Sequence, residues 1–237
     1  MLIDNINITV FGAELLDKKI GTAEFIGTHE WLKKAYKPLT LNKENKYTPI
    51  ECNFVLKATT RQELEEKASH FLKKIEECTI KFDDIEFYYD CILQTKDNEY
   101  IGIDVMDNLY IESIDVMFLS GYKYKSEIIE TMNRLLTKTI NVPGNLETPA
   151  IVEIIPSVDA IDLTIAGLDD DPIIIKNLKQ NKKIIINGED GTVLQDGINK
   201  YGDTDMWDFP RLKPGANTIT ISKNTMDINI KYKGRWI

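Results

Sequence analysis

The stretch WDFPRLKPGANTITISKNTMDINIKYKGRWI, residues 207–237, decides the fold of the C-terminal half of the chain. Apolar and polar residues alternate through 219–221 and again through 228–232, a pattern typical of strands with one buried face. Pro214 and Gly215 form a turn signal before these strands, because proline fixes one φ angle and glycine allows a positive one. The stretch has no histidine and no cysteine. It therefore predicts a β-module without an evident catalytic group.

Further short β runs precede this stretch, and no convincing helix interrupts them. Turn signals such as Asn187-Gly188 and Asp190-Gly191 separate the runs. The predicted strands of this half are 150–155, 161–165, 173–175, 184–186, 192–194, 218–221 and 228–232. About seven short strands in a hundred residues are typical of a β-sandwich or jelly roll. The character of the sequence changes at a Pro- and Gly-containing segment, residues 139–149, which predicts a boundary near residue 138.

The N-terminal half contains one clear helix among strands. Thr60 and Glu63 fit a capping box, in which each side chain accepts a hydrogen bond from the other residue's backbone N–H. Apolar residues then follow at helical spacing, which predicts a helix over residues 61–77. The predicted strands around it are 51–56, 79–82, 86–89 and 110–118. We expect an α+β domain over residues 1–138, with antiparallel sheets and one main helix, and an all-β domain over residues 139–237.

Composition and charge exclude several classes of protein. The 237 residues are 43% hydrophobic and 28% charged, as in a globular protein. The N-terminus lacks the pattern of a secretion signal, and no apolar run is long enough to span a membrane. The formal net charge of −9 argues against a surface that grips nucleic acid, which needs a clustered basic face. It does not argue against a protein past which DNA slides without binding.

Residues that could carry chemistry are few, and each has a simpler interpretation. We expect Cys52, Cys78 and Cys91 to be buried free thiols and His29 and His70 to be solvated surface side chains. Three consecutive aspartates, 169–171, contain enough oxygens for a calcium loop but precede a proline as a solvated turn does. Three aromatics, 87–89, look like a sugar-stacking platform, yet alternation along a strand favours packing against a core. We therefore expect no catalytic residue, no cofactor and no metal.

Several motifs resemble those of a known family, the distal tail proteins of long-tailed bacteriophages. The resemblance is specific in the second half and generic in the first. Its markers there are Pro143-Gly144-Asn145 with Pro149, Asn187-Gly188 with Asp196-Gly197, Phe209-Pro210-Arg211-Leu212, Pro214-Gly215-Ala216-Asn217, and Tyr232 with Arg235-Trp236. The first half matches by layout: a strand, the helix, Ile80-Lys81-Phe82-Asp83-Asp84 and a long strand ending at Phe118. The family's Gly-rich loop near residue 40 is replaced by Thr40-Leu41-Asn42-Lys43-Glu44-Asn45-Lys46.

The resemblance implies a structural virion protein. In the family the second half is a galectin-like β-sandwich, and six copies close into a ring with a central channel at the end of the tail tube. The N-terminal domains would form the inner belt, and the C-terminal domains would project outward. The implied partners are further copies of the chain, the tail tube protein, a hub or tip protein and receptor-binding or baseplate proteins. The implied location is the virion tail tip, after assembly in the bacterial cytoplasm.

Two other functions remain open at this point. One is a carbohydrate-binding module that grips a glycan through Trp207 and Trp236. Residues 139–237 lack the histidine that galectins use, and fold alone does not confer lectin activity. The other alternative is a different tail component, such as a tube or neck protein.

An acidic segment suggests how the channel would be lined. Residues 83–115 contain ten acids and one base, Lys96, a net charge of −9, so the charges of the rest of the chain cancel. We expect 95–99 to be a loop between two strands. Its acids would face the lumen and repel DNA phosphates at contact range, because salt screens charges over about 8 Å. The candidate channel-lining residues are Asp97, Glu99, Asp104 and Asp107.

Overall fold

A computed structural model describes all residues, 1–237, and its contacts divide the chain into two compact units. The first, unit 1, comprises residues 1–123 and Ile237, and the second, unit 2, comprises residues 124–236. The division lies after residue 123, earlier than the boundary near residue 138 that the sequence predicts. The reason is that β10 (Ile128–Thr131) pairs with β21 (Met226–Tyr232) in a sheet of unit 2. No helix of the structure is long and apolar enough to cross a membrane.

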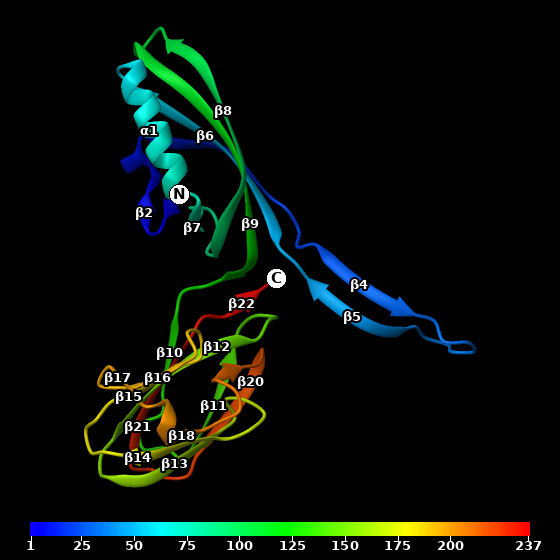
Figure 1. Cartoon of the computed structure of the whole chain (residues 1–237), viewed down its shortest axis with the longest axis vertical. Helices are drawn as coiled ribbons and strands as arrows, with labels where there is room; N and C mark the ends of the chain where they lie inside the picture. Colours follow the sequence, from blue (N-terminus) through cyan, green and yellow to red (C-terminus); the bar gives the residue numbers. More distant parts are fainter. The chain divides into compact units, whose positions relative to one another are not determined.

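Unit 1 consists of antiparallel strands and one α-helix, as the sequence predicts (Figure 1). Its main sheet has the strand order β2-β1-β7-β8-β9-β6-β3, and β4 and β5 form a separate two-stranded sheet. The elements are β1 (Leu2–Ile3), β2 (Ile6–Asn7), η1 (Ile8–Phe11), β3 (Ala13–Ile20), β4 (Phe25–Glu30), β5 (Leu39–Asn45), β6 (Thr48–Ala58), α1 (Arg61–Lys74), β7 (Glu77–Lys81), β8 (Tyr88–Asp104) and β9 (Leu109–Tyr124).

Helix α1 begins at the predicted N-cap. The Thr60 hydroxyl accepts a hydrogen bond from the Glu63 N–H at 3.1 Å. The reverse bond differs from the prediction, because the Glu63 carboxylate accepts from the N–H of Thr59 at 3.0 Å. The Lys67 ammonium, together with hydrogen bonds from Thr59, lowers the pKa of Glu63 to about 2. The helix ends at Lys74, three residues before the predicted end, and Ile75 is its C-cap.

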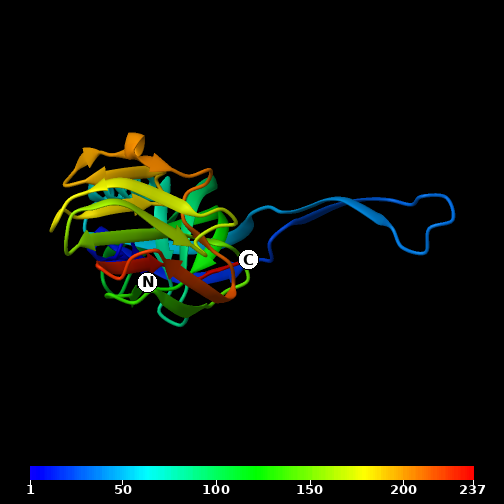
Figure 2. The same ribbon diagram turned by 90° about the horizontal axis from the view of Figure 1, so that it is seen from below.

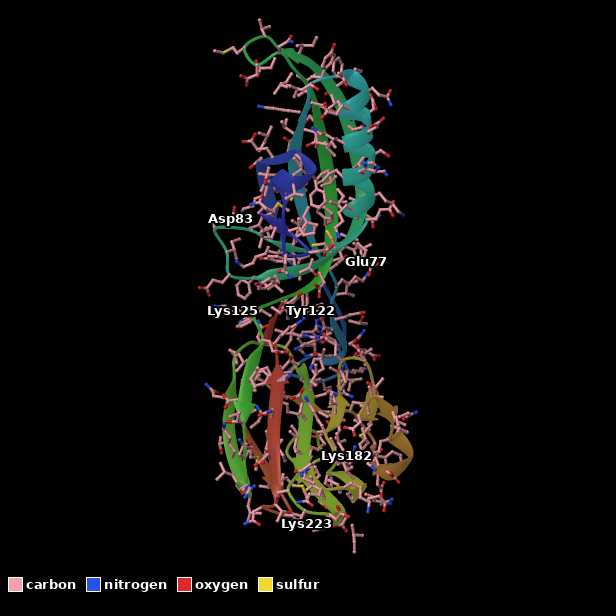
Figure 3. All side chains as sticks on the ribbon, turned by 90° about the vertical axis from the view of Figure 1, so that its left-hand side faces the viewer. Glu77, Asp83, Tyr122, Lys125, Lys182 and Lys223 are labelled. Carbon is pink, nitrogen blue, oxygen red and sulfur yellow. The ribbon has the colours of Figure 1, made fainter.

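The core of unit 1 forms where α1 covers one face of the main sheet. Leu64, Ala68 and Phe71 are buried on the helix, and the ring of Phe71 packs edge-on against Phe54 of β6 at 5.1 Å. Tyr89 of β8 is also buried, against Phe82 at 6.1 Å, which confirms core packing for this aromatic segment. The N-terminal ammonium of Met1 contacts Asp83, labelled in Figure 3, at 2.6 Å.

Unit 2 is almost wholly β, and its only helical segment outside the strands is the three-residue η2. Two antiparallel sheets, β10-β21-β12-β15-β16-β17 with β19 beside β12, and β11-β20-β13-β14-β18, contribute buried residues to one core. The remaining bounds are β11 (Thr137–Val142), β12 (Thr148–Pro156), β13 (Ala160–Ala166), β14 (Ile173–Leu178), β15 (Ile184–Asn187), β16 (Thr192–Gln195), β17 (Ile198–Asn199), η2 (Tyr201–Asp203), β18 (Thr204–Asp205), β19 (Arg211–Leu212), β20 (Gly215–Ile221) and β22 (Arg235–Trp236).

The apolar alternation of residues 219–221 and 228–232 produces part of this core. Ile219 and Ile221 of β20 are buried, and in β21 every second residue from Met226 to Tyr232 is buried. Each strand therefore presents one apolar face to the interior and one polar face to the outside. Each of the seven strands predicted for this half overlaps a strand of the structure.

Candidate functional site

The expected acidic loop at residues 95–99 is not a loop. These residues lie inside β8, which runs to Asp104, and the turn to β9 comes later, at residues 105–108. The prediction was wrong because this part of β8 is exposed on both faces. A strand without a buried face shows no apolar alternation, so it cannot be told from a loop by periodicity. The acids consequently divide into Asp97 and Glu99 in the strand and Asp104 and Asp107 beside the turn.

Asp97 lies on the polar face of the main sheet, opposite to the face that α1 covers. It lines a shallow groove together with polar side chains of β3, β6 and β9: Asp17, Lys18, Lys19, Glu51, Asn53, Thr95, Lys96 and Asp115. Asn53 donates to the carboxylate of Asp115 at 2.7 Å and to the hydroxyl of Ser113 at 3.0 Å. The groove therefore carries both charges, with carboxylates and lysines interspersed.

Residues 104–107, the end of β8 and most of the turn to β9, combine acids that form no ion pair with exposed apolar side chains. Val105 and Met106 are 93% and 94% exposed, and Ile101 and Ile103 are exposed just before them. Asp104 accepts a hydrogen bond only from the backbone N–H of Met106, at 2.9 Å, and Asp107 has no ion-pair partner. We call residues 104–107 the acidic turn. The apolar side chains of the acidic turn have no covering surface within the chain itself.

The parts of β8 and β9 next to the acidic turn, residues 98–103 and 109–112, form its stem. Side chains on the helix side of the sheet hold this stem in place. Asn98 donates to the carboxylate of Glu112 at 2.7 Å, and Glu112 is only 1% exposed. The other carboxylate oxygen of Glu112 is buried without a hydrogen-bond partner. The guanidinium of Arg61, at the start of α1, stacks over the ring of Tyr100 at 3.7 Å. These contacts fix β8 against β9 up to the turn.

We expect Asn98→Ala to destabilise this stem by about 1–3 kcal/mol, because it leaves a buried carboxylate without its only side-chain donor. Adding Glu112→Gln should recover most of the loss, since a neutral amide costs less to bury than a charge. Hydrogen exchange of the β8 and β9 amides measures the effect. Gln94→Ala, at an exposed position of the same strand, is the matched control. Equal protection in Asn98→Ala and in this control would contradict the assigned role of Glu112.

The sequence pattern did not predict the hairpin of β4 and β5, residues 25–45. Figure 2 shows it as a separate arm of unit 1 (blue). Every residue of β5 is exposed, and no residue of 25–45 belongs to the core cluster of unit 1. Its exposed apolar residues are Phe25, Trp31, Leu32, Tyr36, Leu39 and Leu41. The alternation Leu39-Thr40-Leu41 was the available signal, but it covers only three residues.

The loop that closes this hairpin, residues 31–38, carries a basic and aromatic cluster. Lys33, Lys34 and Lys37 are exposed and form no ion pair within the chain, and Trp31 and Tyr36 are 67% and 101% exposed beside them. We call residues 31–37 the basic tip. His29, in β4, contacts the hydroxyl of Thr40 at 3.2 Å and is exposed, as predicted.

The cysteines are buried free thiols, as predicted. Cys78 and Cys91 are directly opposite each other in the β7–β8 pairing, and Cys52 is buried in the same core. Burial raises the pKa of Cys52 and of Cys78 to about 12, and it raises that of Cys91 as well. A protonated, buried thiol is a poor nucleophile and a poor metal ligand. These residues serve as packing.

Other predicted candidates are exposed side chains without a shared site. His70 lies on the exposed face of α1, and Asp170 pairs with Lys213 at 2.7 Å. No group of three or more His, Cys, Asp or Glu side chains is arranged to hold a metal ion. Trp207 is 87% exposed, whereas Trp236 is half-buried.

A protein-family model matches most of unit 2. Residues 143–236 match the family model of the siphovirus-type tail component, C-terminal domain. The match covers this part of unit 2 and bears out its resemblance to phage distal tail proteins. The carbohydrate-binding alternative is not favoured by this match. No curated protein matches the sequence.

Solved structures share the fold over nearly the whole chain. The Dit (gp 19.1) protein of phage SPP1, described as a paradigm of the hub adsorption apparatus in phages that infect Gram-positive bacteria, superposes with a TM-score of 0.77. It is 10% identical, and the match covers 100% of this chain and 98% of that one. A chain of the phage P2 baseplate, in its activated conformation with calcium, has a TM-score of 0.57 at 13% identity, covering 95% and 92%. These matches show that the fold is shared.

Proposed function

We propose that this chain is the ring-forming component of a phage tail hub, in which six copies close around a central channel. Unit 1 forms the ring that continues the tail tube. Unit 2, whose two sheets we assign to a galectin-like sandwich, carries receptor-binding or baseplate proteins. The function is mechanical, and we assign it no catalytic step. The chain would act in the virion tail tip, after assembly with tail tube and hub proteins in the host cytoplasm.

The observation that carries this proposal is the hairpin of β4 and β5. A two-stranded hairpin is marginally stable in water unless another surface covers it. Here six large apolar side chains, from Phe25 to Leu41, are exposed on such a hairpin. A neighbouring copy of the chain supplies the missing surface. The hairpin of one copy would contact a different surface on the next copy, so the contact is heterologous. Heterologous contacts between identical chains close into rings when the rotation from copy to copy allows it.

We assign Asp97 and Glu99 to the wall of the channel. They are exposed, form no ion pair within the chain, and occupy alternate positions of β8, so their side chains share a face of the sheet. Asp97 borders the polar groove on that face. Repeated around a ring, these carboxylates would keep DNA phosphates from adhering, which suits a conduit and is the opposite of a basic binding groove.

The mass of the full chain in solution tests the ring. Light scattering coupled to size exclusion, over a range of concentrations, should reveal a species with six times the mass of the 27.2 kDa chain. The species should persist on dilution to micromolar concentration. A chain that stays monomeric at every concentration, or stops at a twofold-symmetric dimer, would contradict the proposal.

A further inference from the structure

We propose that the basic tip of one copy binds the acidic turn of the next copy, and that this contact sets the head-to-tail order of the ring. The inference rests on the proposed function, since it needs the chain to associate with itself. It assigns the interface to residues 31–37 on one side and residues 104–107 on the other. Asp104 and Asp107 thereby receive an interface role, distinct from the channel role of Asp97 and Glu99.

The two surfaces are complementary in charge. The basic tip has three lysines, Lys33, Lys34 and Lys37, that form no ion pair within the chain. The acidic turn has two carboxylates, those of Asp104 and Asp107, that also form no ion pair within the chain. Elsewhere several exposed charges are paired, as in Lys179 with Asp159 at 3.2 Å and Lys182 with Asp196 at 2.8 Å. Complementary potentials of this kind steer association and fix its register.

The two surfaces are also complementary in their apolar parts. The tip presents Trp31 and Tyr36, and the turn presents Val105 and Met106, all at least 67% exposed. Aromatic residues and methionine are enriched at the centres of protein interfaces, where burying them supplies most of the binding free energy. Exposed apolar side chains surrounded by unpaired charges have the composition of an interface core with a polar rim.

The position of the two surfaces makes the contact intermolecular. In the β6–β9 pairing, Thr48 is opposite Ser120 and Ala58 is opposite Tyr110. The hairpin joins β6 at its Thr48 end, whereas the acidic turn lies beyond the Tyr110 end. Strands rise about 3.3 Å per residue, so the two ends of β6 are separated by roughly 35 Å. A tip at one end and its complement at the other can satisfy each other only between copies, in a head-to-tail arrangement.

Specific contacts shape the stem of each surface. The stem of the acidic turn is fixed by the Asn98–Glu112 hydrogen bond and by the stacking of Arg61 on Tyr100. The basic tip is closed by a hydrogen bond from the Ala35 N–H to the Leu32 carbonyl at 2.9 Å, and its strands pair from Phe25 with Asn45 to Glu30 with Leu39. The acidic turn is therefore pre-formed and loses less conformational entropy on binding, whereas the hairpin gains stability from the copy that covers it.

Charge reversal tests the contact directly. One variant carries Lys33→Glu, Lys34→Glu and Lys37→Glu, and a second carries Asp104→Lys and Asp107→Lys. Each alone meets like charge on its neighbour, so we expect the affinity between copies to fall at least about 100-fold and the ring to dissociate. Both sets combined in one chain should restore assembly. An equimolar mixture of the two variants should also assemble, with the variants alternating around a ring of even number.

Matched controls separate this inference from the ring itself. Lys176→Glu, at an exposed position of strand β14 in unit 2, changes charge away from both the hairpin and the acidic turn and should leave assembly unchanged. If the wild-type chain forms a ring and both charge-reversal variants still form it, the tip–turn contact is wrong and the ring proposal stands. The same holds if the wild-type chain forms a ring and the combined variant stays monomeric although each unit is folded. A wild-type chain that never associates would overturn both.

Discussion

Replacing residues 25–45 with a two-residue turn should abolish assembly while unit 1 remains folded. The structure makes this deletion feasible, because the Lys46 N–H already donates to the Glu24 carbonyl at 2.8 Å, so an Asn-Gly turn can join these residues. The removed segment contributes nothing to the buried core of unit 1. It does contain the basic tip and the exposed apolar residues that we assign to the neighbouring copy. Light scattering should therefore report a monomer.

The control for the deletion keeps the hairpin and removes only its apolar surface. Trp31→Ser with Tyr36→Ser should weaken assembly without changing the circular dichroism of the chain, because both side chains are exposed. Each exposed aromatic that becomes buried at an interface is worth more than about 2 kcal/mol where it acts as a hot spot. A deletion variant that still forms the wild-type assembly would show that the ring uses other surfaces.

Phe71→Ala should destabilise unit 1 by about 3–5 kcal/mol, the cost of emptying a fully buried aromatic position. Phe71 is 0% exposed, and its ring packs against Phe54 at 5.1 Å and Phe11 at 6.3 Å. It joins the helix, β6 and the N-terminal segment. Hydrogen exchange of unit 1 peptides measures the loss separately from unit 2, since a chain of two units need not unfold in a single transition.

The neighbouring residue provides the matched control. His70→Ala lies on the exposed face of the same helix and should change the stability by less than about 0.5 kcal/mol. It should also leave assembly intact, because we assign no role to His70. A loss below about 1 kcal/mol for Phe71→Ala would show that α1 does not hold the core of unit 1 together.

Periodicity predicted those elements that have one buried face. Helix α1 and the strands of unit 2 are of this kind: Leu64, Ala68 and Phe71 recur at helical spacing, and Ile228, Ile230 and Tyr232 recur at strand spacing. Burial on one side and solvent on the other imposes the pattern that the sequence reveals. The fold class followed from these elements.

The candidate interface could not be predicted in this way, because its elements have no buried face in the single chain. Strand β5 is exposed at every residue, and so is β8 from Gln94 to Ile101. We expect their apolar residues to be buried against another copy and not against the core of this chain. Their positions therefore show no hydrophobic period of 2 or 3.6 residues. The lysines of the basic tip and the aspartates of the acidic turn, by contrast, can be recognised as charge clusters in the sequence. Only the structure shows that they lie beyond opposite ends of β6.

Electron microscopy of the assembled full chain tests the central claim most directly. We expect a closed sixfold ring with an open channel, with Asp97 and Glu99 facing the lumen. It also predicts that the hairpin of each copy lies on its neighbour. Open filaments, closed dimers or isolated chains would contradict the ring. A ring whose lumen is lined by other residues, or in which lysines of the neighbouring copy neutralise Asp97 and Glu99, would contradict the assignment of the channel wall.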